Sequence, residues 1–253
     1  MNEKQTIGSN TAKNGFKNED DIVEKFNNWE SDLDAQAWLT IMKYKLKEIV
    51  FVEAIKISGY KTDVQVQVNI KLKKALDVQN LQVKLVSNPK GFNQIDKRWV
   101  DKYVEMWEIP NNVTSILKRY TGEEIPNIKK PADKRRMFAN EFTENEQTII
   151  LKWLKKNQAL IVSDILKGRG KFAAEWMLVA QKVNKNARWI LKPMNYCMNH
   201  FGNGEIEITA RGNFKIGRIT MQRKGGDGGR DTAKMLQFKI NPAEIFENQS
   251  PNR

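Results

Sequence analysis

Alternation of apolar and polar residues is strongest in the first third of the chain. Residues 62–70, TDVQVQVNI, alternate strictly, with four β-branched residues on one side and polar residues on the other. A period of two residues is typical of a β-strand with one face in the core. The flanking runs 49–57 and 76–87 are also rich in β-forming residues, so this region predicts three strands.

Apolar residues at helical spacing predict helices on both sides of these strands. Residues 19–29 carry Ile22, Phe26 and Trp29 at that spacing, with Asn18 as the expected N-cap. Further helices are expected at residues 34–48, 94–108, 143–157 and 186–202. The helix at 143–157 opens with TENE, a capping box, and the helix at 186–202 is expected to end at Gly202.

The remaining segments predict strands and one long loop. Residues 172–182 are expected to form a strand, and the last third contains three more β-rich runs, EIEIT, FKIGRITMQRK and MLQFKI. Residues 121–136 hold two prolines and a basic run and are expected to form an exposed loop. The order of elements predicts an α/β (α+β) fold with a central mixed β-sheet flanked by helices. At 253 residues, we interpret the chain as a single domain, 1–253.

The charge balance points to a polyanionic partner. The chain has 43 Lys and Arg against 30 Asp and Glu, a formal net charge of +13, which favours nucleic acid or an anionic membrane surface. No apolar run is long enough to span a membrane, and the N-terminus lacks the apolar core of a signal peptide, so we expect a cytoplasmic protein. Cys197 is the only cysteine, which excludes an internal disulfide, and Cys197 and His200 alone cannot make a zinc site.

Two polar residues interrupt the apolar run at 76–87, LDVQNLQVKLVS. Gln82 and Lys84 are two residues apart, so a strand points both to the same face. Asp63 opens the polar face of the preceding strand, with eighteen residues between it and Gln82, the length of a hairpin. If the two strands pair, an acid, an amide and a lysine converge. The oxygens suit Mg²⁺, and the lysine suits charge neutralisation at a phosphate. The alternative is a solvated strand face with no chemistry.

This spacing resembles the signature of the PD-(D/E)xK nucleases. Thr62 stands in place of the proline and Gln82 in place of the second acid. Longer segments resemble a narrower family, the HinP-type type II restriction endonucleases, from about residue 8 to about residue 246. These segments are TAKNGFKNEDDI, QVKLVSNPKGFNQIDKRW, DKRRMFANEF, ILKGRGKFAAEWMLVAQKVNKNARWIL and MQRKGGDGGRDTAKMLQFKI. In that family the triplet is itself Ser-Asp…Gln-x-Lys, so Gln82 is the family's own variant and Thr62 is a mild departure.

The resemblance implies a Mg²⁺-dependent endonuclease that cuts double-stranded DNA at a short palindromic site, GCGC. It implies catalysis by Asp63, Gln82 and Lys84, with Asp63, Gln82 and the carbonyl of Val83 at the metal. Glu19 is a further candidate ligand; alternatively, it only favours the N-terminus of its helix. A palindromic site requires two active sites, supplied by a homodimer or by sequential nicking, and a cognate DNA methyltransferase is the expected genetic partner. The catalytic core is expected at about 15–110, with about 170–246 contributing to DNA recognition.

The loop 87–97 directly follows the expected catalytic strand. Asn93 and Gln94 carry both donors and acceptors, as contacts to base edges require. Phe92 is a candidate wedge between base steps, and the alternative is a buried anchor of the loop. Lys90 and Lys97 are candidates for phosphate contacts, which position DNA without specifying its sequence.

A second candidate for DNA recognition is the glycine-rich cluster 222–230. Arg223, Lys224 and Arg230 are candidates for contacts to guanine, with Gln222 and Gln237 as weaker ones. The alternative is a plain glycine-rich turn. Other basic residues fit a solvated surface that contacts the DNA backbone: Lys134, Arg135, Arg136 and Arg169. Two different functions stay open, a DNA-repair nuclease on the same core and a nucleic-acid-binding protein without catalysis.

Overall fold

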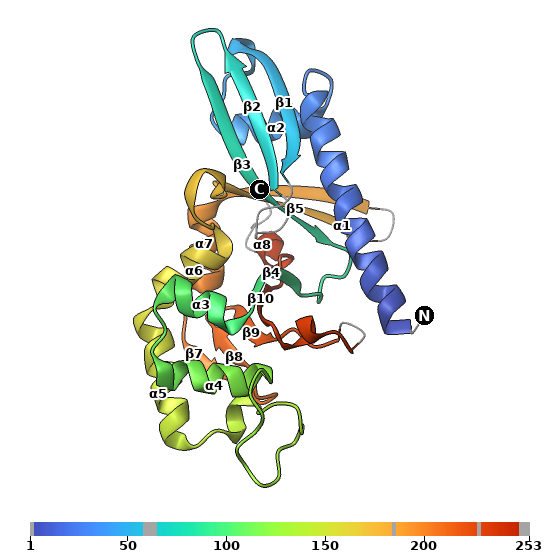
Figure 1. Cartoon of the computed structure of the whole chain (residues 1–253). Helices are drawn as coiled ribbons and strands as arrows, with labels where there is room; N and C mark the ends of the chain where they lie inside the picture. Colours follow the sequence, from blue (N-terminus) through green and yellow to red (C-terminus); the bar gives the residue numbers. More distant parts are fainter. Residues whose placement is uncertain (1–2, 58–64, 184–185, 227–228, 248–253) are drawn as a thin grey trace. The chain divides into compact units, whose positions relative to one another are not determined.

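The computed structural model describes residues 3–57, 65–183, 186–226 and 229–247 (Figure 1). The chain divides into two compact units, each with its own five-stranded sheet. Unit 1 consists of Met1–Asn93, Leu166–Cys197 and Asn241–Arg253, and unit 2 consists of Gln94–Ile165 and Met198–Ile240.

A mixed sheet forms the centre of unit 1, with the strand order β1-β2-β3-β5-β6. Its strands are β1 (Ile49–Ile57), β2 (Gln65–Leu72), β3 (Leu76–Val86), β5 (Trp176–Val183) and β6 (Asn186–Pro193). The pair β3–β5 is parallel and the other pairs are antiparallel. The helices are α1 (Glu3–Asn27), α2 (Leu33–Ile41) and the short α8 (Glu244–Glu247), with 3-10 turns at Leu46–Glu48 and Gly170–Phe172.

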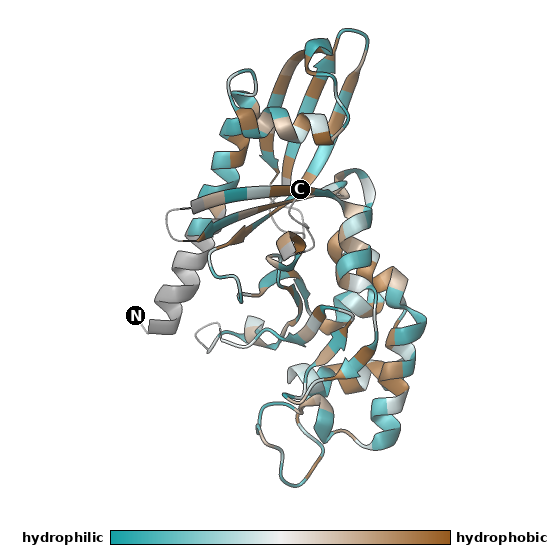
Figure 2. Cartoon of the chain, turned by 180° about the vertical axis from the view of Figure 1, so that it is seen from behind, coloured by the Kyte–Doolittle hydropathy of each residue, from teal (hydrophilic) through white to brown (hydrophobic). Residues whose placement is uncertain are grey.

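One face of this sheet carries the core of unit 1. Val66 of β2 and Leu81 and Val83 of β3 join Ile22 and Phe26 of α1 in one buried cluster, which also includes residues of α2. In β2, apolar residues occupy every second position, and the strands in Figure 2 carry both brown and teal stretches. Because side chains alternate along a strand, α1 and α2 cover the face that bears Leu81 and Val83.

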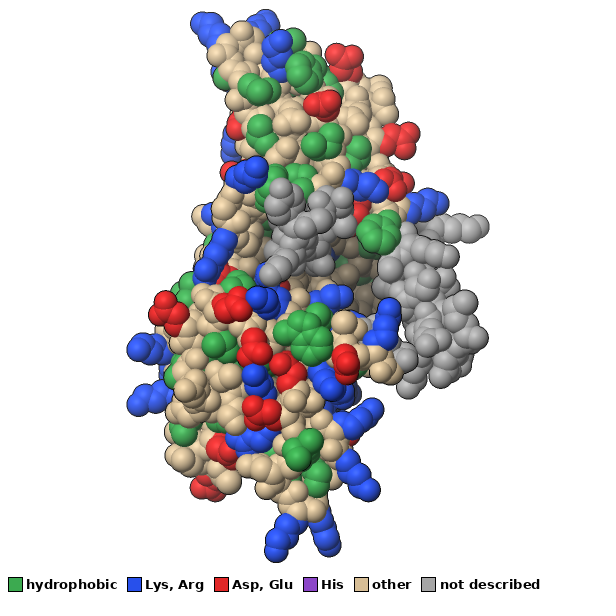
Figure 3. Space-filling model, viewed as in Figure 1, with side chains coloured by type: hydrophobic (Ala, Val, Ile, Leu, Met, Phe, Trp, Pro, Cys, Tyr) green, Lys and Arg blue, Asp and Glu red, His purple; other side chains and the backbone are tan. Residues whose placement is uncertain are grey.

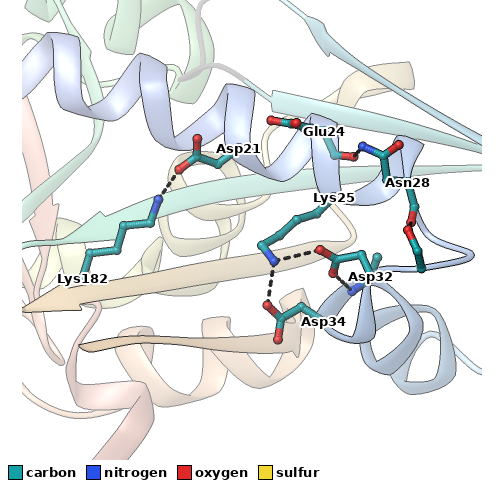
Figure 4. Close-up of polar contacts among 9 residues, drawn as sticks. Asp21, Glu24, Lys25, Asn28, Asp32, Asp34 and Lys182 are labelled. Carbon is teal, nitrogen blue, oxygen red and sulfur yellow. Dashed lines mark hydrogen bonds and ion pairs between the residues drawn. The ribbon is translucent and has the colours of Figure 1, made fainter. Parts of the chain in front are cut away.

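Ion pairs attach α1 to its neighbours in unit 1. Asp21 pairs with Lys182 on β5, and Lys25 contacts Asp32 at 2.9 Å and Asp34 at 2.8 Å (Figure 4). Asp32 is also the N-cap of α2, where its side chain accepts from the N–H of Ala35. These contacts join the first helix both to the sheet and to the start of the second helix.

Unit 2 is built around the second five-stranded sheet, which has the strand order β4-β10-β9-β8-β7. Its strands are β4 (Asn93–Arg98), β7 (Ile206–Ile208), β8 (Phe214–Ile216), β9 (Ile219–Arg223) and β10 (Leu236–Ile240). Its helices are α3 (Val100–Trp107), α4 (Asn111–Thr121), α5 (Glu144–Lys156), α6 (Gln158–Leu166) and α7 (Met194–Gly202), the last two crossing into unit 1. Shorter 3-10 turns lie at Ala139–Glu141 and Asp231–Lys234. In its core, Tyr103 stacks on Trp107 at 4.7 Å and meets Phe238 edge-on at 5.5 Å.

Most of the predicted elements are confirmed, including the mixed sheet flanked by helices. Strands β1 and β3 match the predicted runs, and β5 and the C-terminal strands lie where the sequence places them. Thr143 caps α5 as predicted: its hydroxyl accepts from the N–H of Glu146, whose carboxylate accepts from the N–H of Thr143. Within the described residues, no helix is long and apolar enough to cross a membrane.

The helix predicted at 94–108 is wrong in its first third. Residues 93–98 form β4, and the helix begins only at Val100. A strand points Asp96 and Arg98 to one side, where two hydrogen bonds of 3.0 and 2.7 Å join them, and the hydroxyl of Tyr103 donates to Asp96. The hydrogen bonds among Asp96, Arg98 and Tyr103 require the extended backbone at 93–98. They therefore outweigh the helical spacing of the aromatic residues.

The helix predicted at 186–202 is also wrong in its first half. Residues 186–193 form β6, which pairs with β5 along its whole length, and α7 begins after Pro193. Pro193 cannot donate a backbone hydrogen bond, but β6 is an edge strand, where this costs little.

Two boundaries at the N-terminal end differ as well. Helix α1 begins at Glu3, so Asn18 is no N-cap; it lies inside the helix and is buried. The helix predicted at 34–48 ends at Ile41, and only a 3-10 turn follows at Leu46–Glu48.

Candidate functional site

Gln82 and Lys84 are buried polar residues in the middle of β3. They point away from the core cluster that holds Leu81 and Val83, and only 1% and 5% of their surfaces are exposed. The register puts Gln82 opposite Gln65 of β2 and Met177 of β5. The predicted pairing of the two strands is therefore confirmed, and β2 and β3 form a hairpin.

The amide of Gln82 lacks a hydrogen bond that its neighbour has. Asn80, two residues earlier on the same face, accepts from Gln67 at 3.1 Å and donates to the carbonyl of Lys171 at 2.9 Å. The Oε1 of Gln82 is buried and has no hydrogen-bond partner within the described residues. Since an unsatisfied buried acceptor costs about 1–3 kcal/mol, this oxygen is suited to a ligand that completes its coordination.

The other predicted metal ligands are Asp63, Glu19 and Val83, and the structure describes the surroundings of only the last two. Asp63 lies outside the described residues, two positions before the start of β2. Glu19 is buried well inside α1, which begins at Glu3, so it does not act at the N-terminus of its helix. The side chain of Val83 belongs to the core. The described part of the chain has no group of three or more His, Cys, Asp or Glu that could hold a metal ion.

The loop after β3 is an ordered turn that presents Phe92. Asn88 organises it: its side chain accepts from the N–H of Lys90 at 2.9 Å, and its carbonyl accepts from Gly91 at 2.8 Å. Asn241 donates to the carbonyl of Pro89 at 2.9 Å. Phe92 is 52% exposed, so it is not the buried anchor that was the alternative. Asn93 and Gln94 open β4 and are half-buried, and Lys97 is exposed on the same strand.

The glycine-rich cluster lines a pocket of about 560 Å³ in unit 2. Gln222, Arg223 and Arg230 contribute to it, and the turn that precedes Met137 contributes Asp133, Arg135 and Arg136. We call this cavity the arginine pocket. In Figure 3, Lys and Arg side chains project from the lowest part of the view, where the loop after α4 lies.

The pocket holds positive charge in partly buried positions. Burial lowers the pKa of Arg223, and the neighbouring Arg135 and Arg136 lower it further. The Nε of Arg223 is buried without a hydrogen-bond partner among the described residues. Hydrogen bonds from Arg135 lower the pKa of Asp133 to about 2. Excess positive charge with an unsatisfied donor makes the pocket suited to an acceptor-rich or anionic ligand.

Two other candidate base contacts are placed differently. Lys224 follows Arg223, and its backbone N–H donates to Met235 at 2.8 Å. Gln237 is 3% exposed on β10, which leaves its side chain little access to DNA. Asp133 was interpreted only as part of the exposed loop 121–136, and Arg135 and Arg136 as part of a solvated surface that contacts the DNA backbone. All three line the pocket. The spacing of an acid and an arginine two residues apart in a turn is the sequence signal that could have marked them.

The fold is that of a restriction endonuclease. A crystal structure of the restriction endonuclease MspI in complex with its cognate DNA is similar, with a TM-score of 0.63 over 94% of this chain and 93% of that chain. The two sequences are 15% identical, so this likeness establishes the fold alone.

The particular family follows from the sequence. The model of the R.HinP1I restriction endonuclease family matches residues 42–246, and the chain belongs to this family. It is therefore a restriction endonuclease, an enzyme that cleaves DNA site-specifically. A comparison with curated proteins finds no match.

Proposed function

We propose that this enzyme hydrolyses phosphodiester bonds of double-stranded DNA at the palindrome GCGC in a reaction that requires Mg²⁺. The observation that carries the proposal is the pair on β3: a buried amide oxygen without a protein partner among the described residues, beside a buried lysine on the same face. Membership in the R.HinP1I family supports the substrate and the reaction.

The residues of β3 fit a hard divalent cation. Mg²⁺ prefers oxygen ligands, and the Oε1 of Gln82 is such a ligand with no competing hydrogen bond from the described residues. The carboxylate of Asp63 and the carbonyl of Val83 would complete the protein's share, with Glu19 as a further candidate. The bound ion would polarise the phosphate and supply a hydroxide-like nucleophile near neutral pH.

Lys84 supplies the positive charge that the reaction needs. Its side chain leaves β3 on the same face as Gln82, so its ammonium group would approach a phosphate bound at this site. There it orients the attacking water or neutralises the negative charge that develops on the phosphate oxygens. Burial of both side chains keeps bulk water away and strengthens these electrostatic interactions.

Recognition of DNA divides between two groups of residues. Phe92, Asn93, Gln94 and Lys97 follow the catalytic strand directly, and the exposed Phe92 would wedge between base steps. Gln222, Arg223, Lys224 and Arg230 would contact the guanines from the glycine-rich cluster. We propose that unit 1 carries the catalytic residues and that unit 2 contributes to recognition. The palindrome calls for two active sites, from a homodimer or by sequential nicking, and a cognate methyltransferase would protect the host DNA.

Digestion of DNA of known sequence tests this function. Run-off sequencing of the products should show breaks at every GCGC and a fixed position within each. Methylation of the cytosines in GCGC should protect the DNA, and EDTA should stop the reaction. Breaks at another sequence would refute the proposed site, breaks only at damaged bases would indicate a repair nuclease, and cleavage in EDTA would refute the metal requirement.

A further inference from the structure

Arg135 and Asp133 form a two-point ion pair at the arginine pocket. The Nε of Arg135 donates to Oδ1 of Asp133 at 2.9 Å, and an Nη2 hydrogen goes to Oδ2, also at 2.9 Å. The backbone N–H of Arg135 donates to the same carboxylate at 3.0 Å. The carboxylate therefore fixes one whole edge of the guanidinium group.

The adjacent edge of the same guanidinium, between its two terminal nitrogens, is left for a ligand. The side chain of Arg135 is 74% exposed, whereas that of Asp133 is 18% exposed. Of the five N–H donors of an arginine, the pair with Asp133 uses two and three remain. Two of these three, one on each terminal nitrogen, point outward in parallel from the end of the guanidinium group. Two parallel donors at this spacing match the O6 and N7 acceptors of guanine in the major groove.

The backbone that carries this pair is held in place. The carbonyl of Asp133 accepts from the N–H of Arg136 at 3.1 Å, which closes the turn. Gly122, with φ +84°, ends α4 against this turn, and a Cβ at Gly122 would lie 2.3 Å from the carbonyl oxygen of Arg135. Since the turn is already ordered, little conformational freedom would be lost when DNA binds.

The two neighbouring arginines have other roles in the pocket. The guanidinium of Arg136 lies over the ring of Phe138 at 4.0 Å and over that of Tyr120 at 5.7 Å, and it is half-buried. Arg223 has a buried Nε without a hydrogen-bond partner among the described residues. Arg135 is the one of these three that combines an exposed guanidinium with an edge fixed by a carboxylate.

We infer that Arg135 reads a guanine of the target site through its outward edge and that Asp133 is the positioning residue that aims it. The inference rests on the proposed function, because a GC-only site presents a guanine in every base pair. It adds Arg135 and Asp133 to the candidates for recognition. Adenine presents an N6 donor where guanine presents O6, so a fixed pair of donors meets a donor there and rejects the exchange. Because the pKa of Asp133 is about 2, its carboxylate is ionised throughout the neutral range and the pair persists.

Replacement of single guanine atoms tests the contact. Binding is measured in EDTA, without cleavage, on duplexes in which each guanine of the mapped site in turn is 7-deazaguanine, which lacks the N7 acceptor. The wild-type enzyme should lose affinity at the guanine that Arg135 reads. Arg135→Ala should weaken binding of the unmodified duplex by about 5- to 150-fold and should lose nothing more when that one guanine is replaced.

Two further variants separate the orientation of the Arg135 guanidinium group from its positive charge. Arg135→Lys keeps the positive charge but lacks the two parallel N–H donors of a guanidinium group. This variant should lose discrimination between the cognate and a one-base-changed duplex. Asp133→Asn should lower the ratio of the affinities for the cognate and the one-base-changed duplex, with little effect on the affinity for the one-base-changed duplex. Lys134→Ala, next to both, is the matched control and should weaken both duplexes alike. Thermal unfolding of each variant verifies its folding.

The possible failures point to different conclusions. If Arg135→Ala weakens cognate and altered duplexes by the same factor, or if no guanine couples to it, Arg135 contacts the backbone and the inference is wrong. Such a result leaves the proposed function intact as long as digestion still maps to GCGC. A different cleavage map would refute the proposed function instead, independently of any Arg135 variant.

Discussion

Gln82 and Lys84 stand on the same face of β3, two residues apart, and both are almost completely buried. Strands that bury polar side chains normally satisfy each of them, as Asn80 on this face is satisfied by Gln67 and Lys171. The amide oxygen of Gln82 is an exception among the described residues. A site that keeps an unsatisfied oxygen beside a lysine is costly for folding and useful for holding a cation and a phosphate.

Asp63→Ala should abolish cleavage while leaving specific binding largely intact. The carboxylate is the proposed ligand that neutralises the metal, whereas affinity for DNA comes mainly from contacts to phosphates and bases. Plasmid cleavage in Mg²⁺ and a binding titration in EDTA measure the two properties on one preparation. A variant that still cuts at the wild-type rate would show that Asp63 is not at the metal.

Gln82→Glu should make stability depend on the metal. The new carboxylate adds a buried charge, so without metal the variant should unfold at a lower temperature than the wild type. Mg²⁺ should raise its unfolding temperature by more than it raises that of the wild type, and cleavage should be at least partly retained. Gln82→Ala is the control: unchanged cleavage in that variant would exclude Gln82 as a ligand.

Local sequence determines the strands of unit 1 well, because their period is strict. The runs at 49–57 and 76–87 predicted β1 and β3 to within one residue. The errors lie where a helical spacing of aromatic residues coincides with a strand. At 93–98 the buried pair of Asp96 and Arg98 decides the backbone, and at 186–193 pairing with β5 decides it. Both determinants are contacts between side chains or strands that a linear pattern does not contain.

The same distinction applies to the candidate sites. The spacing of Gln82 and Lys84 predicted a shared face, and the register confirms it. The sequence predicted the arginine pocket only in part. It indicated the cations of 222–230 as candidate DNA contacts, but the turn that holds Asp133 and Arg135 was interpreted as solvated surface. That turn is ordered by Gly122 and Phe138, whose contacts with it arise from the fold of unit 2.

Thr143→Ala should destabilise the enzyme by about 1 kcal/mol and leave DNA discrimination unchanged. The substitution removes the side-chain acceptor of the capping box at the start of α5, a loss that typically costs about 0.5–2 kcal/mol. Thr143→Ser keeps the hydroxyl and should stay close to the wild type. Chemical denaturation gives the free energies of unfolding, and equal values for the two variants would show that the cap contributes nothing.

Gly122→Ala should cost more stability than Gly170→Ala. Both glycines have positive φ, +84° and +74°, so both substitutions carry the strain of a left-handed alanine, about 1 kcal/mol. Only at Gly122 would the new Cβ meet the carbonyl of Arg135; nothing lies within 4 Å at Gly170. Denaturation of the two variants measures the difference. Equal losses would show that the 133–136 turn moves away freely.

Arg223→Ala and Lys134→Ala should weaken DNA binding in ways that differ in kind. A lost bidentate contact to guanine costs about 1–3 kcal/mol and relaxes discrimination at one position, because only the correct base made that contact. A lost phosphate contact weakens every sequence alike and makes the dependence on salt less steep, since one fewer counterion is released. Titrations of cognate and one-base-changed duplexes at two salt concentrations separate the two patterns. The partly buried Arg223, with its neighbours in the arginine pocket, is expected to follow the first pattern, and the exposed Lys134 the second. If Arg223→Ala lowers the affinity for both duplexes by the same factor, Arg223 contacts the DNA backbone. Base recognition would then be assigned to the loop that carries Phe92, Asn93 and Gln94.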